Sequence, residues 1–75
     1  MLKLRNQELE EMLVKIAQAH RSGLTCGGFV TNILKSGYIF QVNGDSLAKV
    51  IHASLVDLCE DGVLARSEER VYEMN

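Results

Sequence analysis

The sequence contains no proline and no tryptophan, and it has only two phenylalanines and two tyrosines. Without proline, no position forces a helix to break, so the six glycines supply the breaks between elements. No apolar run is long enough for a signal peptide or a membrane span. We therefore expect a cytoplasmic protein that does not enter a membrane.

Cysteine and histidine are also scarce, with two of each along the chain. Cys26, Cys59, His20 and His52 lack the short paired spacing that structural zinc sites require. In the cytoplasm the two thiols stay reduced, and small buried thiols are the usual form of such cysteines. The sequence therefore predicts no metal site.

Signatures of catalysis are missing as well. The pair Gly27 and Gly28 is not a phosphate-binding loop, because the Gly-Lys-Ser/Thr of that motif does not follow it. Serine, histidine and aspartate all occur, but no local signature marks one of them as part of a nucleophilic site. A chain of 75 residues also has little room for a buried substrate pocket. We therefore expect no enzyme activity and no cofactor.

Length and composition describe one small globular domain over residues 1–75. Hydrophobic residues make up 47% of the chain, which favours a folded protein over a disordered one. A core of this size is marginal, so a dimer or a bound partner would add stability. The net charge of −2 counts against a nucleic-acid binder, although a local basic face is compatible with an acidic chain.

Residues 6–21 have the apolar spacing of an amphipathic helix. Glutamates come early in this stretch and basic residues come late, which suits the helix dipole. Asn6 is a suitable N-cap, and Gly23 ends the helix. The residues predicted to be buried along one stripe are Leu9, Met12, Leu13, Ile16 and Ala17.

A second, shorter helix is predicted over residues 28–36, after a connector in which Thr25 is a candidate N-cap. Its apolar residues keep helical spacing, although its β-branched content leaves a strand open. The next segment, 38–42, is apolar and strand-like, and it packs under the third helix or adds an edge strand. In the alternative reading it is an exposed patch for a protein partner, formed by Tyr38, Ile39, Phe40 and Val42.

The stretch from residue 45 to residue 61 predicts the third and longest helix. A turn signal, Asn43-Gly44, precedes it, and Asp45 or Ser46 can cap it. Gly62 ends the helix, because glycine adopts the left-handed conformation at low cost. One buried stripe recurs at helical spacing and consists of Leu47, Val50, Ile51, Ser54, Leu55 and Leu58.

The end of the sequence predicts a β-hairpin. Its strands cover residues 63–66 and 70–74, and the polar loop 67–69 connects them. In this register Arg66 and Arg70 lie opposite each other, and nearby glutamates relieve their repulsion.

The order of a helix, a short helix, a longer helix and a terminal hairpin is that of a winged helix-turn-helix domain. The chain resembles this family over nearly its whole length, and the most specific part is residues 55–66 (LVDLCEDGVLAR) followed by Tyr72. The family's pattern is a helix ending in leucines, an acidic residue and glycine, then an apolar strand with arginine and a returning strand with an aromatic residue. The resemblance implies a mainly α fold of three helices with a C-terminal β-hairpin wing. The compact size also resembles small bacterial or phage-encoded regulators.

This resemblance implies a DNA-binding regulator of transcription. The helix over 45–61 would enter the major groove as the recognition helix, and residues 63–74 would form the wing. The protein would act as a homodimer, because one small module buries little DNA surface and two half-sites raise the affinity. The implied contacts to double-stranded DNA come from Ser46, Lys49, His52, Ala53, Arg66, Arg70 and Lys35.

Acidic residues favour a second interpretation, a winged helix that binds protein and not DNA. Glu68 and Glu69 at the wing tip would repel phosphates, and carboxylates also crowd the end of the third helix, where the dipole disfavours them. The partner surface would then be residues 38–42 or the apolar end of the third helix. Under this interpretation Lys49 and His52 belong to an ordinary solvated helix face.

Overall fold

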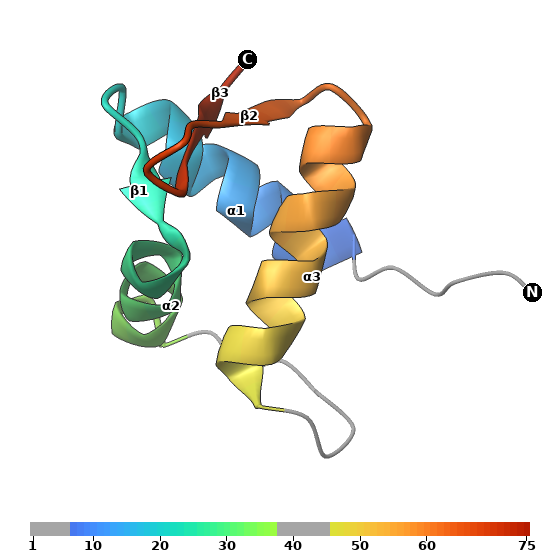
Figure 1. The fold of residues 1–75 in the computed structure, drawn as a ribbon. Coiled ribbons are helices and arrows are strands. Elements are labelled where there is room, and N and C mark those ends of the chain that lie inside the picture. Colours follow the sequence, from blue (N-terminus) through green and yellow to red (C-terminus); the bar gives the residue numbers. More distant parts are fainter. Residues whose placement is uncertain (1–6, 38–45) are drawn as a thin grey trace, which may run out of the picture.

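The computed structural model describes residues 7–37 and 46–75 (Figure 1). The described part is mainly helical with a small antiparallel sheet, and its layout is that of a winged helix-turn-helix domain. The fold class predicted from the sequence is thereby confirmed. The elements in chain order are α1 (Gln7–Ala19), β1 (Leu24–Thr25), α2 (Cys26–Lys35), α3 (Leu47–Glu60), β2 (Leu64–Arg66) and β3 (Val71–Met74).

One hydrophobic core joins all three helices to the wing, which we define as β2, β3 and the turn between them. In α1 the residues Leu9, Leu13 and Ala17 are buried, while Met12 and Ile16 pack partly buried against them. The predicted stripe of this helix is therefore confirmed, with its edges less buried than its centre. Asn6, the predicted N-cap, lies outside the described residues. The other buried apolar residues are Phe29, Ile33, Ile51, Leu55, Leu58, Leu64 and Tyr72.

The second helix begins at Cys26, two residues before the predicted start. Thr25 caps it as predicted, since its side-chain oxygen accepts a hydrogen bond from the backbone N–H of Gly28 at 3.2 Å. The glycine pair in this first turn therefore does not break the helix. A Cβ on Gly28 would lie 3.2 Å from side-chain atoms of Leu24, so glycine here lets β1 pack closely on α2.

The segment before α2 is a strand and not the predicted connector. Leu24 pairs with Tyr72 and Thr25 pairs with Val71, so β1 adds a third strand to the hairpin in the order β1-β3-β2. Gly23 has a φ of +82° and lies against β3, where a Cβ would meet the side chain of Val71 and the carbonyl oxygen of Tyr72. Glycine is therefore required both for the conformation of this turn and for its close approach to β3.

The third helix runs from Leu47 to Glu60, inside the predicted range. Ser46 is its N-cap, because its side-chain oxygen accepts from the backbone N–H of Lys49 at 3.2 Å. Asp45, the alternative cap, lies outside the described residues, as does the segment 38–42. Gly62 follows the helix with a φ of +79°, as predicted. The buried residues are Ile51, Ser54, Leu55 and Leu58, and Leu47 and Val50 are partly buried.

The register of the wing differs from the predicted one. Arg66 lies opposite Tyr72, so the expected cross-strand pair of Arg66 and Arg70 is wrong. The backbone N–H of Ser67 donates to the carbonyl of Val71 at 2.9 Å, which leaves Arg70 inside the turn with a φ of +62°. Turns of this length often end on a left-handed residue, which is usually glycine. The loop contains no glycine, so the left-handed position at Arg70 could not be predicted from the sequence.

Candidate functional site

A groove of about 360 Å³ lies where the start of α2, the exposed face of α3 and the wing meet; we call it the wing groove. It brings together three of the seven residues predicted to contact DNA, namely His52 from α3 and Arg66 and Arg70 from the wing. The other residues that line it are Thr25, Cys26, Gly27, Glu69 and Tyr72.

The α3 side of the wing groove is a row of exposed side chains. Lys49, His52 and Ala53 are all exposed, and His52 and Ala53 follow Lys49 by about one helical turn. Ile51 and Leu55 are buried on the opposite side of the helix, so this row faces the solvent. Of this row only His52 lines the groove itself, and Lys49 and Ala53 extend the same face beyond it.

Arg66 is held in place by a buried aromatic pair. Its guanidinium carbon lies 5.9 Å from the centroid of the Tyr72 ring, within the range of a cation–π interaction. Tyr72 is 2% exposed and packs edge-to-face on Phe29, with ring centroids 6.4 Å apart. The exposed Arg66 side chain is thereby restrained by a residue of the hydrophobic core. It therefore loses less side-chain entropy when it binds a ligand.

Arg70 occupies a backbone conformation that costs free energy. It is the one non-glycine residue with positive φ in the described ranges. For a residue with a Cβ, the left-handed region costs roughly 1–2 kcal/mol, whereas glycine adopts it freely. Strained residues of this kind often cluster at functional sites. The side chain of Arg70 is exposed and lines the wing groove. The strained backbone at this position therefore places a positive charge in the groove.

The N-terminal end of α2 forms the third wall. Within α2, which is described throughout, the first turn carries no acidic residue, and the Thr25 cap engages the N–H of Gly28. The helix dipole therefore gives this end a partial positive charge that no carboxylate in the turn neutralises. The thiol of Cys26 donates to the carbonyl of Ala48 at 3.9 Å and so links the starts of α2 and α3.

Both cysteines are free thiols and are half-buried. Burial raises the pKa of Cys26 above its ordinary value. Burial also raises the pKa of Cys59, and the nearby positive charge of Arg66 opposes this shift. A raised pKa keeps a cysteine in its neutral thiol form near neutral pH, and the thiol is the less reactive form.

The charges of the wing groove are mixed but mainly positive. Arg66 and Arg70 are cationic, and His52 adds a ring N–H donor. Glu69 is the carboxylate among the lining residues, whereas Glu68 is exposed on the turn and does not line the groove. The acidic tip predicted from the sequence is therefore divided, with one glutamate at the groove and one outside it.

The remaining predicted contact residues lie around the groove and not in it. Ser46 caps α3 and is exposed, and Lys35 is exposed at the far end of α2. Sequence reasoning missed Thr25, Gly27 and Tyr72 as lining residues. Thr25 was recognised as a cap, but only the pairing of β1 with β3 brings the start of α2 beside the wing.

Comparison of this chain with protein-family models, with curated proteins and with solved structures finds no match. Among residues 7–37 and 46–75, no three metal-binding side chains gather into a group that would hold an ion. No helix within the same residues is long and apolar enough to cross a membrane.

Proposed function

We propose that this protein is a DNA-binding regulator of transcription that acts as a homodimer. The observation that carries the proposal is the wing groove, where Arg66, Arg70 and His52 converge on the N-terminal end of α2. Three positively charged or protonatable side chains and a helix N-terminus favour an anionic ligand. The winged helix-turn-helix layout supports a polymer of phosphates as that ligand.

In this proposal the exposed row of α3 reads the major groove. Lys49 donates to the acceptor edge of a guanine or to a phosphate, and His52 donates to a neighbouring acceptor. Ala53 is small enough to contact a thymine methyl group. Ser46 already accepts a bond from the Lys49 backbone, but its hydroxyl hydrogen is available for a phosphate.

The wing and α2 then hold the phosphate backbone. Arg66 and Arg70 bind phosphate oxygens or enter the minor groove, and Lys35 contacts the backbone from the end of α2. Contacts from these three cations would give a slope of about −3 in a plot of log K against log salt concentration. Two copies of the module would contact half-sites about 34 Å apart along the duplex. Such a regulator would work in the cytoplasm, by binding and without catalysis.

A second candidate function is protein binding without DNA. The position of Glu69 in the wing groove favours it, because a carboxylate beside the arginines weakens the attraction for phosphate. The segment 38–42, with Tyr38, Ile39, Phe40 and Val42 as the expected partner surface, lies outside the described residues. This candidate predicts a folded protein with no affinity for DNA.

Fluorescence anisotropy of a labelled mixed-sequence duplex, titrated with protein at several salt concentrations, tests the proposal. Regulation by DNA binding predicts a dissociation constant in about the micromolar range at low salt, weakening steeply as salt rises. Absence of binding at low salt, by protein shown to be folded from its circular dichroism, would contradict the proposal and leave protein binding as the function.

A further inference from the structure

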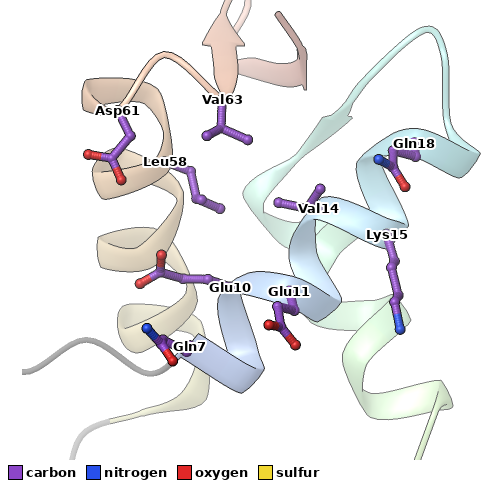
Figure 2. A pocket seen from close by; sticks show the side chains of 9 residues that line it. All are labelled: Gln7, Glu10, Glu11, Val14, Lys15, Gln18, Leu58, Asp61 and Val63. Atoms are coloured by element: carbon purple, nitrogen blue, oxygen red, sulfur yellow. The ribbon is translucent and has the colours of Figure 1, made fainter.

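A second groove, of about 540 Å³, lies between α1 and the corner where α3 leads into β2 (Figure 2). Six of its lining residues come from α1, and the other three come from the corner where α3 leads into β2. We call it the α1 groove. It shares no lining residue with the wing groove, so occupation of one leaves the side chains of the other available.

The floor of the α1 groove is apolar. Val14 from α1 and Leu58 and Val63 from the opposite wall point into the same space (Figure 2). Leu58 is nearly buried, while Val14 and Val63 are half-buried and pack on the edge of the core. This floor is too short for the interface of a folded domain, but it has room for two or three apolar side chains of a peptide.

The rim of the α1 groove is acidic. Glu10, Glu11 and Asp61 line it, and Lys15 is the cation among its lining residues. Among the described residues that line the groove, three carboxylates and one ammonium give a formal net charge of −2. A cationic ligand is therefore attracted, and an anion such as DNA is repelled.

The charge also argues against two copies of the chain packed groove to groove. In such a contact the carboxylates of one rim would face those of the other, which opposes association. We infer that the α1 groove binds a basic peptide segment of another protein. Two or three apolar side chains of the segment lie on Val14, Leu58 and Val63, and a lysine or arginine of the segment pairs with Glu11 on the rim. This inference does not depend on the proposed binding of DNA.

The test is a fluorescence anisotropy titration of the full chain with a short synthetic peptide. The peptide is acetylated, amidated and labelled, and it carries leucines at helical spacing with lysines between them. Two comparison peptides replace every lysine by glutamate, or every leucine by serine. The inference predicts saturable binding of the leucine–lysine peptide and at least tenfold weaker binding of both comparison peptides. Failure of the leucine–lysine peptide to bind folded protein at low salt would overturn it.

Matched variants on α1 locate the binding site. Glu11→Lys should weaken the leucine–lysine peptide roughly tenfold, because it removes one attraction and adds one repulsion of the size found at exposed ion pairs. Glu8→Lys makes the same charge change on the same helix at an exposed position that does not line the groove, and should change the affinity less than twofold. Equal effects of the two variants would overturn the inference, since binding would then follow net charge alone.

Sedimentation velocity of the free protein distinguishes a second copy as the occupant. Residues 2–5 of this chain, Leu-Lys-Leu-Arg, have the apolar and basic chemistry that the groove would select. A dimer that dissociates in Glu11→Lys and persists in Glu8→Lys would show that another copy of the chain fills the groove, and would overturn a separate protein as partner. A sedimentation coefficient unchanged by Glu11→Lys supports the inference.

Discussion

The wing groove and the α1 groove have opposite charge on the same small domain. Two arginines and a histidine face one glutamate in the wing groove, whereas three carboxylates face one lysine in the α1 groove. The net charge of −2 is a sum over the whole chain and does not show that the two surfaces differ in sign. For a chain of this size, the sign of a binding surface follows from which elements meet there and not from composition.

Helix α3 contributes to both grooves through different parts of its length. Its middle presents His52 to the wing groove, and its end presents Leu58 and Asp61 to the α1 groove. The two grooves also differ in support. The wing groove includes the buried ring of Tyr72, whereas the α1 groove has only Leu58 nearly buried among its apolar residues. We therefore expect substitutions of apolar residues in the wing groove to lower the stability of the fold strongly, and those of half-buried residues in the α1 groove to lower it little.

The largest expected effect tests this difference in support. Tyr72→Ala should lower the free energy of unfolding by about 3–5 kcal/mol, because it removes a buried ring that contacts both Phe29 and Arg66. Val14→Ala in the α1 groove should cost only about 1 kcal/mol, since Val14 is half-buried. Urea denaturation followed by circular dichroism measures both. Tyr72→Phe is the control, and it should stay within about 1 kcal/mol of the original chain. If Tyr72→Ala and Val14→Ala lowered the free energy of unfolding by similar amounts, the two grooves would not differ in how much their residues contribute to the core.

A smaller effect tests whether DNA binds to the wing groove and the exposed row of α3 beside it. Lys49→Glu should weaken duplex binding by about 10- to 100-fold, because a donor is lost from the exposed row of α3 and a repulsive charge replaces it. The fold should persist, since Lys49 is exposed. Glu11→Lys, which adds positive charge at the α1 groove, is the matched control and should leave specific binding nearly unchanged. Unchanged affinity in Lys49→Glu would remove α3 from the major groove.

Arg70 allows stability and binding to be separated. Arg70→Gly should raise the free energy of unfolding by about 1 kcal/mol, because glycine relieves the positive φ of 62° while losing some backbone entropy. The same change should lower the magnitude of the salt slope for DNA binding by about 1, since one phosphate contact is lost. Arg70→Lys keeps the positive charge and the backbone strain, so it should change neither the free energy of unfolding nor the salt slope greatly. A destabilised Arg70→Gly protein would mean that the arginine side chain stabilises the turn by more than its strain.

The smallest expected effect concerns the acidic turn of the wing. Glu68→Ala should leave DNA binding unchanged or tighten it up to about twofold, because Glu68 is exposed and does not line the wing groove. Glu69→Ala should tighten binding more, since Glu69 lines that groove. Anisotropy titrations at one low salt concentration compare the two variants. Weaker binding in either variant would indicate that the glutamates orient the arginines.

Much of the fold followed from local patterns in the sequence. The stripes of α1 and α3 were readable because helical spacing of apolar residues is a strong signal over several turns. Gly62 was predicted as a helix end and follows α3 with positive φ. Gly23 was also predicted to end a helix, but α1 already ends at Ala19, and Gly23 lies in the turn before β1. The start of α2 was misplaced because Gly27 and Gly28 look like breakers. The role of Gly28 depends on a contact with Leu24, which local sequence does not show.

The wing groove was only partly predictable. Arg66, Arg70 and His52 were identified through a family resemblance, but their convergence with the start of α2 depends on β1, which is only two residues long. A strand that short shows no alternation, so its pairing with β3 has no sequence signal. The α1 groove was not foreseen either. The acidic start of α1 suited the helix dipole on its own, and nothing in the sequence placed Val63 opposite Val14.

Amide chemical-shift mapping by NMR tests the separation of the two grooves most directly. The ¹⁵N-labelled protein would be titrated with a mixed-sequence duplex at low salt. We expect shifts at Thr25 to Gly28, around Lys49 to Ala53, and at Arg66 to Arg70, with the α1 residues from Glu10 to Gln18 unaffected. Shifts centred on α1 and the end of α3, or none at all from folded protein, would contradict it.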